Sequence, residues 1–170
     1  LTMILSYHEH FSKGDEDEIV KIFIIGIGWE RTAKYCIHAL SICCHELPLS
    51  TSKSLVQMLN QMAPSITQPH VSVHILEFLA CLSRLHHVYV NFRETEYRIV
   101  LGICFRYLDY AREKRRSNRS SHNSEPSTAP GTPGTGTGVT DASPLAAPSE
   151  ELPQYVHALA YHVILFWFLA

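Results

Sequence analysis

Cysteine and histidine are the residue types in this chain with the most evident capacity for chemistry. Residues of these two types gather within one short stretch: Cys36, His38, Cys43, Cys44 and His45. A zinc site usually begins with a Cys-x₂₋₄-Cys pair and needs a second ligand pair, and this spacing does not supply that pattern. We therefore predict no metal site. The cysteines of the chain, which also include Cys81 and Cys104, are interpreted as small buried hydrophobic residues in a reducing compartment.

A Gly-x-Gly pattern follows a run of β-branched residues, as it does where a strand enters a phosphate-binding turn. The two glycines are Gly26 and Gly28, but Arg31 stands where the dinucleotide fingerprint requires a third glycine. No Lys-Ser or Lys-Thr pair follows to make a P-loop. We therefore interpret residues 19–27 as a short buried helix closed by the glycine pair. A strand without nucleotide function is the alternative.

The sequence patterns of several common enzyme classes are missing. The H-E-x-x-H pattern fails because Glu46 is followed by Leu47, Pro48 and Leu49, and there is no nucleophile elbow of the G-x-S-x-G type. We therefore predict no catalytic residue, no cofactor and no metal, and we expect that this segment is not an enzyme.

Charged residues cluster in two places, although the formal net charge of −2 points to no particular partner. Four consecutive acids, residues 15–18, precede an apolar run and suit the first turn of a helix, with an acidic docking patch as the alternative. A basic group follows Tyr110 and suits a helix C-terminus: Arg112, Lys114, Arg115, Arg116 and Arg119. Nucleic-acid or membrane contact is the alternative. We predict no nucleic-acid partner because no aromatic side chains are interleaved to stack on bases.

Residues 117–149 have the composition of a disordered linker. Of these 33 residues, 21 are Ser, Thr, Gly or Pro, so the stretch cannot offset the entropy cost of ordering. As a random coil it would span roughly 30 Å. Thr132 and Ser143 each precede a proline and are candidate sites of proline-directed phosphorylation.

Apolar residues recur at helical spacing through the rest of the chain. Residues 29–47 and 55–62 predict one helical hairpin, and residues 71–89 and 99–108 a second, with a hinge at 89–92. Ser50, Thr51 and Ser52 are N-cap candidates for the helix after Pro48. Two hairpins of about 40 residues predict an all-α fold, an α-solenoid of the HEAT or armadillo kind. A four-helix bundle, and hence a self-contained protein-interaction module, is the alternative.

The predicted organisation is helical repeats over 1–116, a linker over 117–149 and the start of a further repeat over 150–170. The first 13 residues are loosely helical and are expected to end at Gly14. The last 16 residues are apolar apart from His157 and His162, so a fragment of an integral membrane protein is a further alternative. We favour an enclosed solenoid helix and no membrane insertion, because histidines are costly inside a bilayer.

Both ends of the sequence are apolar and uncapped, which indicates a fragment of a longer protein. A solenoid without capping repeats exposes apolar surface. We therefore expect the isolated chain to self-associate, or to need a partner, chiefly through three residues at the C-terminal end: Phe166, Trp167 and Phe168.

Several motifs in the second half of the sequence resemble the tuberin family, whose members are GTPase-activating partners of hamartin in the tuberous sclerosis complex. The motifs are VSV…LACL (71–82), VYVNFR (88–93), GICFRYL (102–108), LPQYVHALAYHVI (152–164) and FWF (166–168). The resemblance covers most of residues 69–170 and implies the family's central helical-repeat region.

This resemblance implies a parent protein that switches off a Rheb-type small GTPase and restrains signalling through the TOR kinase. In the family the activating domain lies near the C-terminus, and its asparagine-bearing catalytic helix has no counterpart in this sequence. No site residue is carried over. The segment would then be a cytoplasmic scaffold, peripheral at endomembranes through its partners, that assembles with a hamartin-like subunit or a second tuberin chain.

Overall fold

The protein is all-α in the part of the chain that the structure describes, residues 2–122 and 151–170, and this confirms the predicted fold class. No strand occurs among those residues, so residues 19–27 form a helix and the alternative of a strand is wrong. The elements of this computed structural model are α1 (Thr2–Leu5), η1 (His8–His10), α2 (Lys13–Ile27), α3 (Ala33–Glu46), α4 (Pro48–Met62), η2 (Ala63–Thr67), α5 (Pro69–Leu82), α6 (His86–Tyr89), α7 (Glu94–His122) and α8 (Glu151–Leu169), where η marks a 3₁₀ helix.

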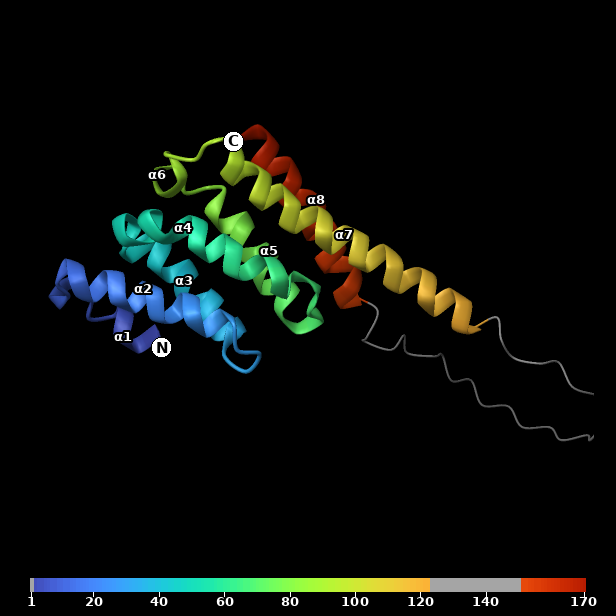
Figure 1. Ribbon diagram of the computed structural model, residues 1–170, viewed down its shortest axis with the longest axis horizontal. Helices are drawn as coiled ribbons and strands as arrows, with labels where there is room; N and C mark the ends of the chain where they lie inside the picture. The colour runs from blue at the N-terminus through green and yellow to red at the C-terminus, as the bar shows by residue number, and fades with distance from the viewer. Residues whose placement is uncertain (1, 123–150) are drawn as a thin grey trace, which may run out of the picture.

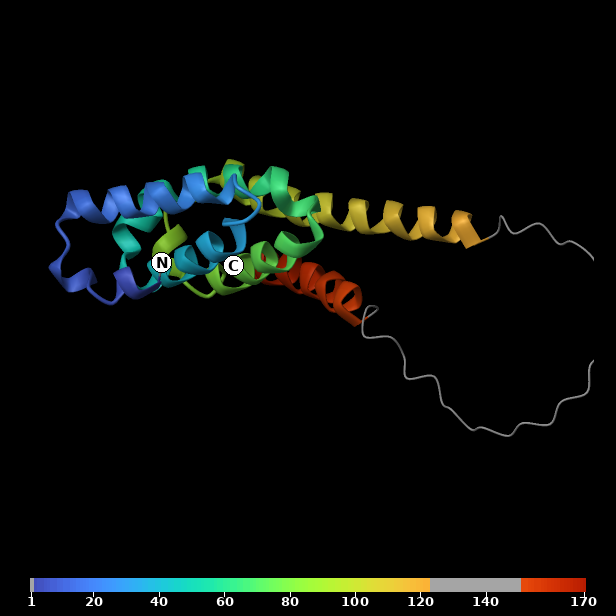
Figure 2. The ribbon, with the colours of Figure 1, turned by 90° about the horizontal axis from the view of Figure 1, so that it is seen from below.

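The long helices lie in two layers (Figures 1 and 2). Helices α2, α4 and α7 lie side by side in one layer, and α3, α5 and α8 in the other. Successive long helices alternate between the layers, and each packs on the next helix of its own layer. This alternation is the arrangement of stacked helical hairpins, in which each hairpin hides its remaining apolar faces on its neighbours.

The pairing of helices differs from the one expected from sequence. Helix α3 was expected to pair with α4, but it packs more extensively on α2, and α7 packs more extensively on α8 than on α5. The hairpins are therefore offset by one helix from the predicted ones. The hinge at residues 89–92 was predicted correctly in place, because α6 ends at Tyr89 and α7 begins at Glu94. The helix before it is shorter than expected and ends at Leu82.

The start of α2 is set by a capping box rather than by the glycine that was expected to end the preceding helix. Gly14 lies in the first turn of α2, and Ser12 is the N-cap. The Asp15 backbone N–H donates to the Ser12 hydroxyl at 3.3 Å, and the Ser12 backbone N–H donates to the Asp15 carboxylate at 2.9 Å. The Asp15 carboxylate also accepts a hydrogen bond from the Ser12 hydroxyl. This bond is the largest cause of the lowered pKa of Asp15, and the bond from the Ser12 backbone N–H is the second. The prediction that the acids begin a helix is therefore confirmed for Asp15 and Glu16.

Two of these acids also connect α2 to α4. The Ser50 hydroxyl donates to the Glu16 carboxylate at 2.9 Å, and the Lys53 ammonium is paired with Asp17. Both carboxylates have a lowered pKa, chiefly because of hydrogen bonds from Lys13 to Glu16 and from Lys53 to Asp17. The acidic run therefore helps to fix the register between two helices of one layer.

The predicted N-caps of α4 are not its caps. The helix begins at Pro48, and Ser50 and Thr51 are buried within it. Proline suits the first turn because its missing N–H has no helical partner there. The Thr51 hydroxyl donates to the Cys43 carbonyl in α3 at 2.9 Å. These hydroxyls therefore connect α4 to its neighbours.

The two glycines at the end of α2 have different functions. Gly28 is the C-cap, as expected for a glycine that closes the helix. Gly26 lies inside the helix, where an added Cβ would be only 2.4 Å from the Cys36 sulfur of α3. The Thr32 hydroxyl donates to the Gly26 carbonyl at 2.8 Å in the same connection. Gly26 is therefore required by the close approach of two helices and not by a turn.

The cysteines lie in the core, as predicted, with one exception. Cys81 is only partly buried, whereas the other thiols, which are all free, are enclosed: Cys36, Cys43, Cys44 and Cys104. Burial raises the pKa of the Cys43 and Cys104 thiols to about 12, because the charged thiolate loses its hydration. These residues therefore behave as small apolar side chains at neutral pH.

Helix α8 is attached to the body of the protein by Trp167. This side chain is 3% exposed, and its indole N–H donates to the Leu79 carbonyl in α5 at 2.9 Å. Phe168, by contrast, is 81% exposed and Phe166 is only partly buried. The expectation that all three aromatic residues drive association is therefore wrong for Trp167, which belongs to the core.

Helix α7 is longer than the sequence suggested. It continues to His122, six residues into the stretch expected to be a linker. The remainder of that predicted disordered linker, residues 123–149, lies outside the described residues. Within the described part of the chain, no helix is both long and apolar enough to cross a bilayer.

Candidate functional site

The residues singled out from the sequence do not form one site. Thr132 and Ser143, the candidate phosphorylation positions, lie outside the described residues. Cys43 and Cys44 are in the core, and the His45 Nε2 atom lies 3.8 Å from the Cys81 sulfur. Among residues 2–122 and 151–170, no group of three or more His, Cys, Asp or Glu side chains has the arrangement needed to hold a metal ion.

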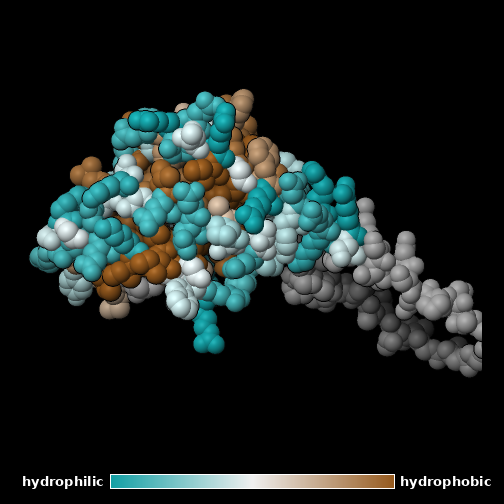
Figure 3. Space-filling model, viewed as in Figure 1, coloured by the Kyte–Doolittle hydropathy of each residue, from teal (hydrophilic) through white to brown (hydrophobic). Residues whose placement is uncertain are grey.

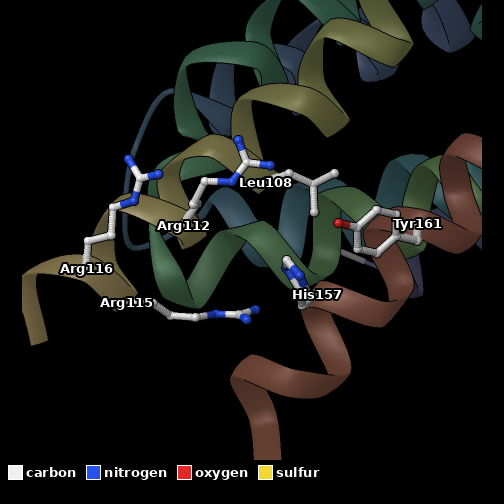
Figure 4. Close-up of a pocket in the computed structure, with 6 residues that line it drawn as sticks. All are labelled: Leu108, Arg112, Arg115, Arg116, His157 and Tyr161. Atoms are coloured by element: carbon white, nitrogen blue, oxygen red, sulfur yellow. The ribbon is translucent and has the colours of Figure 1, made fainter. Parts of the chain in front are cut away.

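A pocket with a basic lining lies between the C-terminal half of α7 and the N-terminal half of α8 (Figure 4). Its volume is about 250 Å³, and its walls are formed by Leu108, Arg112, Arg115, Arg116, His157 and Tyr161. None of the described residues in this lining is acidic.

Helical spacing explains why these side chains meet. In α7 the lining residues follow one another at steps of four, three and one, which places them on one face of the helix. In α8, His157 and Tyr161 are four residues apart and share a face in the same way. Because α7 and α8 pack together, these two faces form opposite walls of the pocket.

His157 occupies the α8 wall in a position that is unusual for an imidazole. Its ring meets the Tyr161 ring edge-on, with centroids 5.2 Å apart. The Nδ1 atom is buried and has no hydrogen-bond partner among the described residues. Burial lowers the pKa of His157, and the positive charges of Arg115 and Arg112 lower it further. The imidazole is therefore held neutral next to two guanidinium groups.

Two arginines of the α7 wall, Arg112 and Arg115, are only weakly neutralised by other described residues. The Arg112 Nη1 atom lies 3.5 Å from the Asp109 Oδ1 atom, and both side chains are largely exposed, so this ion pair is weak. Arg115 has no acidic partner within ion-pair distance in the part of the chain that the structure describes. Its side chain extends from α7 toward His157 (Figure 4). Arg112 and Arg115 therefore give the described part of the lining a positive charge.

The explanation proposed for this basic group from sequence does not hold for these arginines. Cations stabilise the last turn of a helix, and the effect decays beyond that turn. Because α7 continues to His122, Arg116 lies six residues before its end and Arg112 still further back. The signal that sequence reasoning overlooked is the spacing of Leu108, Arg112 and Arg115 on one face of a helix, and His157 could not be connected with them without the packing of α8.

A second feature of the surface is apolar. Hydrophobic residues interrupt the hydrophilic surface over the body of the protein, whereas the projecting end of α7 is hydrophilic (Figure 3). On α2 and directly after its end, the exposed apolar residues are Ile22, Ile25 and Trp29. On α8 a second stripe consists of Tyr161, Leu165, Phe168 and Leu169. Large exposed apolar side chains at such spacing make these two stripes candidate contact surfaces.

Comparison with known proteins connects this architecture to a family. The family model described as Tuberin matches residues 1–114. The chain is also 35% identical over 172 residues to the Tuberous sclerosis 2 protein homolog of Schizosaccharomyces pombe. That alignment covers 99% of this chain but only 11% of the yeast protein, so the chain spans a small part of the relative's length. No solved structure matches the chain.

Proposed function

The chain belongs to the tuberin family, and from that membership we propose that it is a non-catalytic scaffold segment of a tuberin-like GTPase-activating protein. The parent protein would act on a Rheb-type small GTPase, through a domain outside this segment, and so restrain TOR signalling. The segment would contribute by holding other parts of the assembly in place in the cytoplasm. Any attachment to endomembranes would be peripheral and would depend on its partners.

The observation that carries this proposal is the two-layer stack with apolar stripes left exposed on α2 and α8. In a helical-repeat stack, each helix presents one face to its neighbour, so an uncovered apolar face is a site for a further helical layer or a partner chain. The α8 stripe, which includes Leu165 and Phe168, is composed of large side chains that bury much area on contact. A hamartin-like subunit or a second tuberin chain fits such a surface.

The scaffold proposal is tested first by the absence of activity. The 170-residue chain, added to a Rheb-type GTPase loaded with GTP, is expected to leave the rate of hydrolysis unchanged. The full-length parent protein serves as the positive control. Robust stimulation by the isolated chain would contradict the scaffold proposal, because it would require a catalytic group within this segment.

The contact surface is tested by the double variant Leu165→Lys/Phe168→Lys. Sedimentation velocity at tens of micromolar should show that the unmodified chain self-associates and that the variant is closer to a monomer. Both side chains are exposed, so the substitutions should leave the helical content unchanged. Val90→Lys, at an exposed apolar position outside the α8 stripe, is the matched control and should associate as the unmodified chain does. A monodisperse monomer for the unmodified chain would favour the self-contained helical bundle instead.

In the full-length protein the same double variant addresses the partner. It is expected to reduce recovery of a hamartin-like subunit in co-precipitation if that subunit covers the α8 stripe. Loss of tuberin self-association with the hamartin-like subunit still bound would identify a second copy as the occupant. Retention of both contacts would remove the α8 stripe from the proposal.

A further inference from the structure

We propose that the pocket between α7 and α8 is a binding site for a phosphoryl anion, held by Arg112 and Arg115 from one wall and by His157 from the other. The ligand is either inorganic phosphate or the phosphate monoester of a phosphorylated serine or threonine. This site shares only Tyr161 with the apolar stripe of α8, and it does not depend on the scaffold proposal.

The first argument is the geometry of the donors. Guanidinium groups on α7 and the imidazole on α8 line the same pocket, so an anion there would be contacted from two sides (Figure 4). The guanidinium fork matches the oxygens of a phosphoryl group and forms paired, charge-assisted hydrogen bonds to them. A volume of about 250 Å³ accommodates a phosphoryl group together with the end of the side chain that carries it.

The second argument is the imbalance of charge. The described residues of the lining include arginines and no carboxylate. Among the described residues, Arg112 pairs with Asp109 at 3.5 Å, and this pair is exposed and weak, so an anion in the pocket would readily replace it. Arg115 has no ion pair with another described residue. A dianion would therefore gain attraction from Arg112 and Arg115, for which the described part of the chain offers only the weak pair with Asp109 as competition.

The third argument is the buried imidazole nitrogen. A buried polar atom without a hydrogen-bond partner is costly, and few occur in native proteins. The Nδ1 atom of His157 is such an atom among the described residues, and it belongs to a pocket-lining side chain. A turn of the ring toward the cavity would let a phosphoryl oxygen accept a hydrogen bond from this nitrogen and so remove the cost. The nearby negative charge would also counteract the effect of the two arginines on the pKa of His157.

The pocket suits a compact anion better than a nucleic acid or a membrane surface. Nucleic acid is bound by extended basic grooves with aromatic side chains for base stacking, whereas these cations converge on one cavity. A membrane surface would contact the outer face of the helices rather than the space between them. A phosphorylated residue in the segment that connects α7 to α8 would also have a high effective concentration at the pocket, because both walls flank that segment in the sequence. Thr132 and Ser143, predicted from sequence as phosphorylation positions, belong to it.

The proposal is tested by titration calorimetry on the whole 170-residue chain. The titrants are inorganic phosphate and two synthetic peptides, residues 128–137 phosphorylated at Thr132 and residues 139–148 phosphorylated at Ser143, each with its unphosphorylated counterpart. At least one phosphorylated titrant or inorganic phosphate should bind, and a phosphorylated peptide should bind at least about tenfold more tightly than its counterpart. Binding of phosphate alone would identify the free anion as the ligand. Tight binding of a peptide would identify the chain's own segment as the source.

Variants distinguish this pocket from general attraction to positive charge. Arg115→Gln and His157→Gln should each weaken binding by about tenfold or more, since each removes a charge-assisted or buried donor. Arg98→Gln is the matched control, because Arg98 lies on the same helix, is exposed and is not part of the pocket. It should leave binding unchanged. In the unmodified chain, the ring resonances of His157 should shift when the ligand binds, which tests the contact without any substitution.

Four outcomes would overturn the proposal. They are no binding of any phosphorylated titrant or phosphate, equal binding of phosphorylated and unphosphorylated peptides, equal losses for Arg98→Gln and Arg115→Gln, and binding to vesicles containing phosphatidylinositol phosphate without binding to the peptides or phosphate. The last outcome would assign the basic face of α7 to a membrane surface instead.

Discussion

Replacing Trp167 by alanine should detach α8 from the rest of the protein. The indole is 3% exposed and packs in an aromatic cluster, with its ring centroid 4.9 Å from Tyr89, 5.9 Å from Phe92 and 5.9 Å from Tyr97. These rings come from α6, from the residues after it and from α7, while the indole N–H donates to the Leu79 carbonyl of α5. One side chain therefore connects α8 to several other elements.

The expected cost follows from this packing. Truncation of a buried tryptophan to alanine costs about 3–5 kcal/mol through lost apolar burial and the cavity left behind. The lost hydrogen bond contributes about 1 kcal/mol, of the same order as other neutral hydrogen bonds. The Leu79 carbonyl is not left without a hydrogen bond in this variant, because it also accepts one from the Ser83 backbone N–H at 3.1 Å. The larger penalty for an unsatisfied buried acceptor therefore does not apply. For a chain of this size the melting temperature should fall by roughly 10 °C or more.

The assay is thermal and urea unfolding followed by circular dichroism, with two companion variants. Trp167→Phe keeps an aromatic ring but removes the donor, so it should cost about 1–2 kcal/mol, the hydrogen bond plus part of the ring area. Phe168→Ala removes a side chain that is 81% exposed and should change stability by less than about 0.5 kcal/mol.

This reasoning would be refuted if Trp167→Ala and Phe168→Ala had similar small effects. The result would mean that α8 does not dock on α5 through the indole, and the pocket between α7 and α8 would then lose its second wall. A Trp167→Phe variant as unstable as the alanine variant would instead show that the hydrogen bond to Leu79, rather than ring burial, holds the helix.

Three further changes test other parts of the fold. Gly26→Ala should destabilise the protein by about 1–3 kcal/mol in urea unfolding, because the new Cβ would be 2.4 Å from the Cys36 sulfur. Gly102→Ala is the control: its new Cβ would have no described atom within 4 Å apart from the local backbone of its own helix, so it should stabilise α7 by about 0.5–1 kcal/mol. Deletion of residues 125–142 should change the melting temperature by no more than a few degrees, since doubling a loop costs only about 0.6 kcal/mol, and a larger fall would show that the deleted segment packs on the helices. Stability should fall as the pH rises above about 9, because there the unfolded chain releases thiol protons that the folded chain retains. Urea unfolding at pH 7 and at pH 10 should show this loss. Thiol-reagent kinetics at pH 8 should find that Cys81 reacts before the buried thiols, Cys43, Cys44 and Cys104.

Much of the local structure was predictable because it depends on residues close together in the sequence. The apolar spacing in residues 71–82, and the apolar run closed by a glycine pair in residues 19–27, predict helices, and both stretches are helical. The sequence contains the Ser12 and Asp15 pair of the capping box at the start of α2, but Gly14 between them is also a typical helix-ending residue, so local pattern alone does not reveal the cap. Likewise, Ser50 and Thr51 have the side chains of N-caps, but Pro48 begins the helix and burial uses their hydroxyls for contacts between helices.

The candidate site was predictable only in part. The basic group after Tyr110 was recognised, but it was assigned to the end of a helix that in fact continues to His122. Helix length there is a balance between weak local propensities and packing, so composition alone placed the boundary too early. His157 was noted only as a polar residue in an apolar run, because nothing in the sequence connects it with Arg115.

The sequence by itself determined that the chain is helical, that its cysteines serve packing and that it resembles the tuberin family. These properties follow from periodicity, residue type and motif, which are local. Only the tertiary structure decided that Trp167 is buried while Phe168 is exposed, that α3 pairs with α2, and that Arg115 and His157 share a pocket. The physical reason is that each apolar helix offers more than one face for burial, and the choice among them depends on the summed contacts of helices distant in sequence.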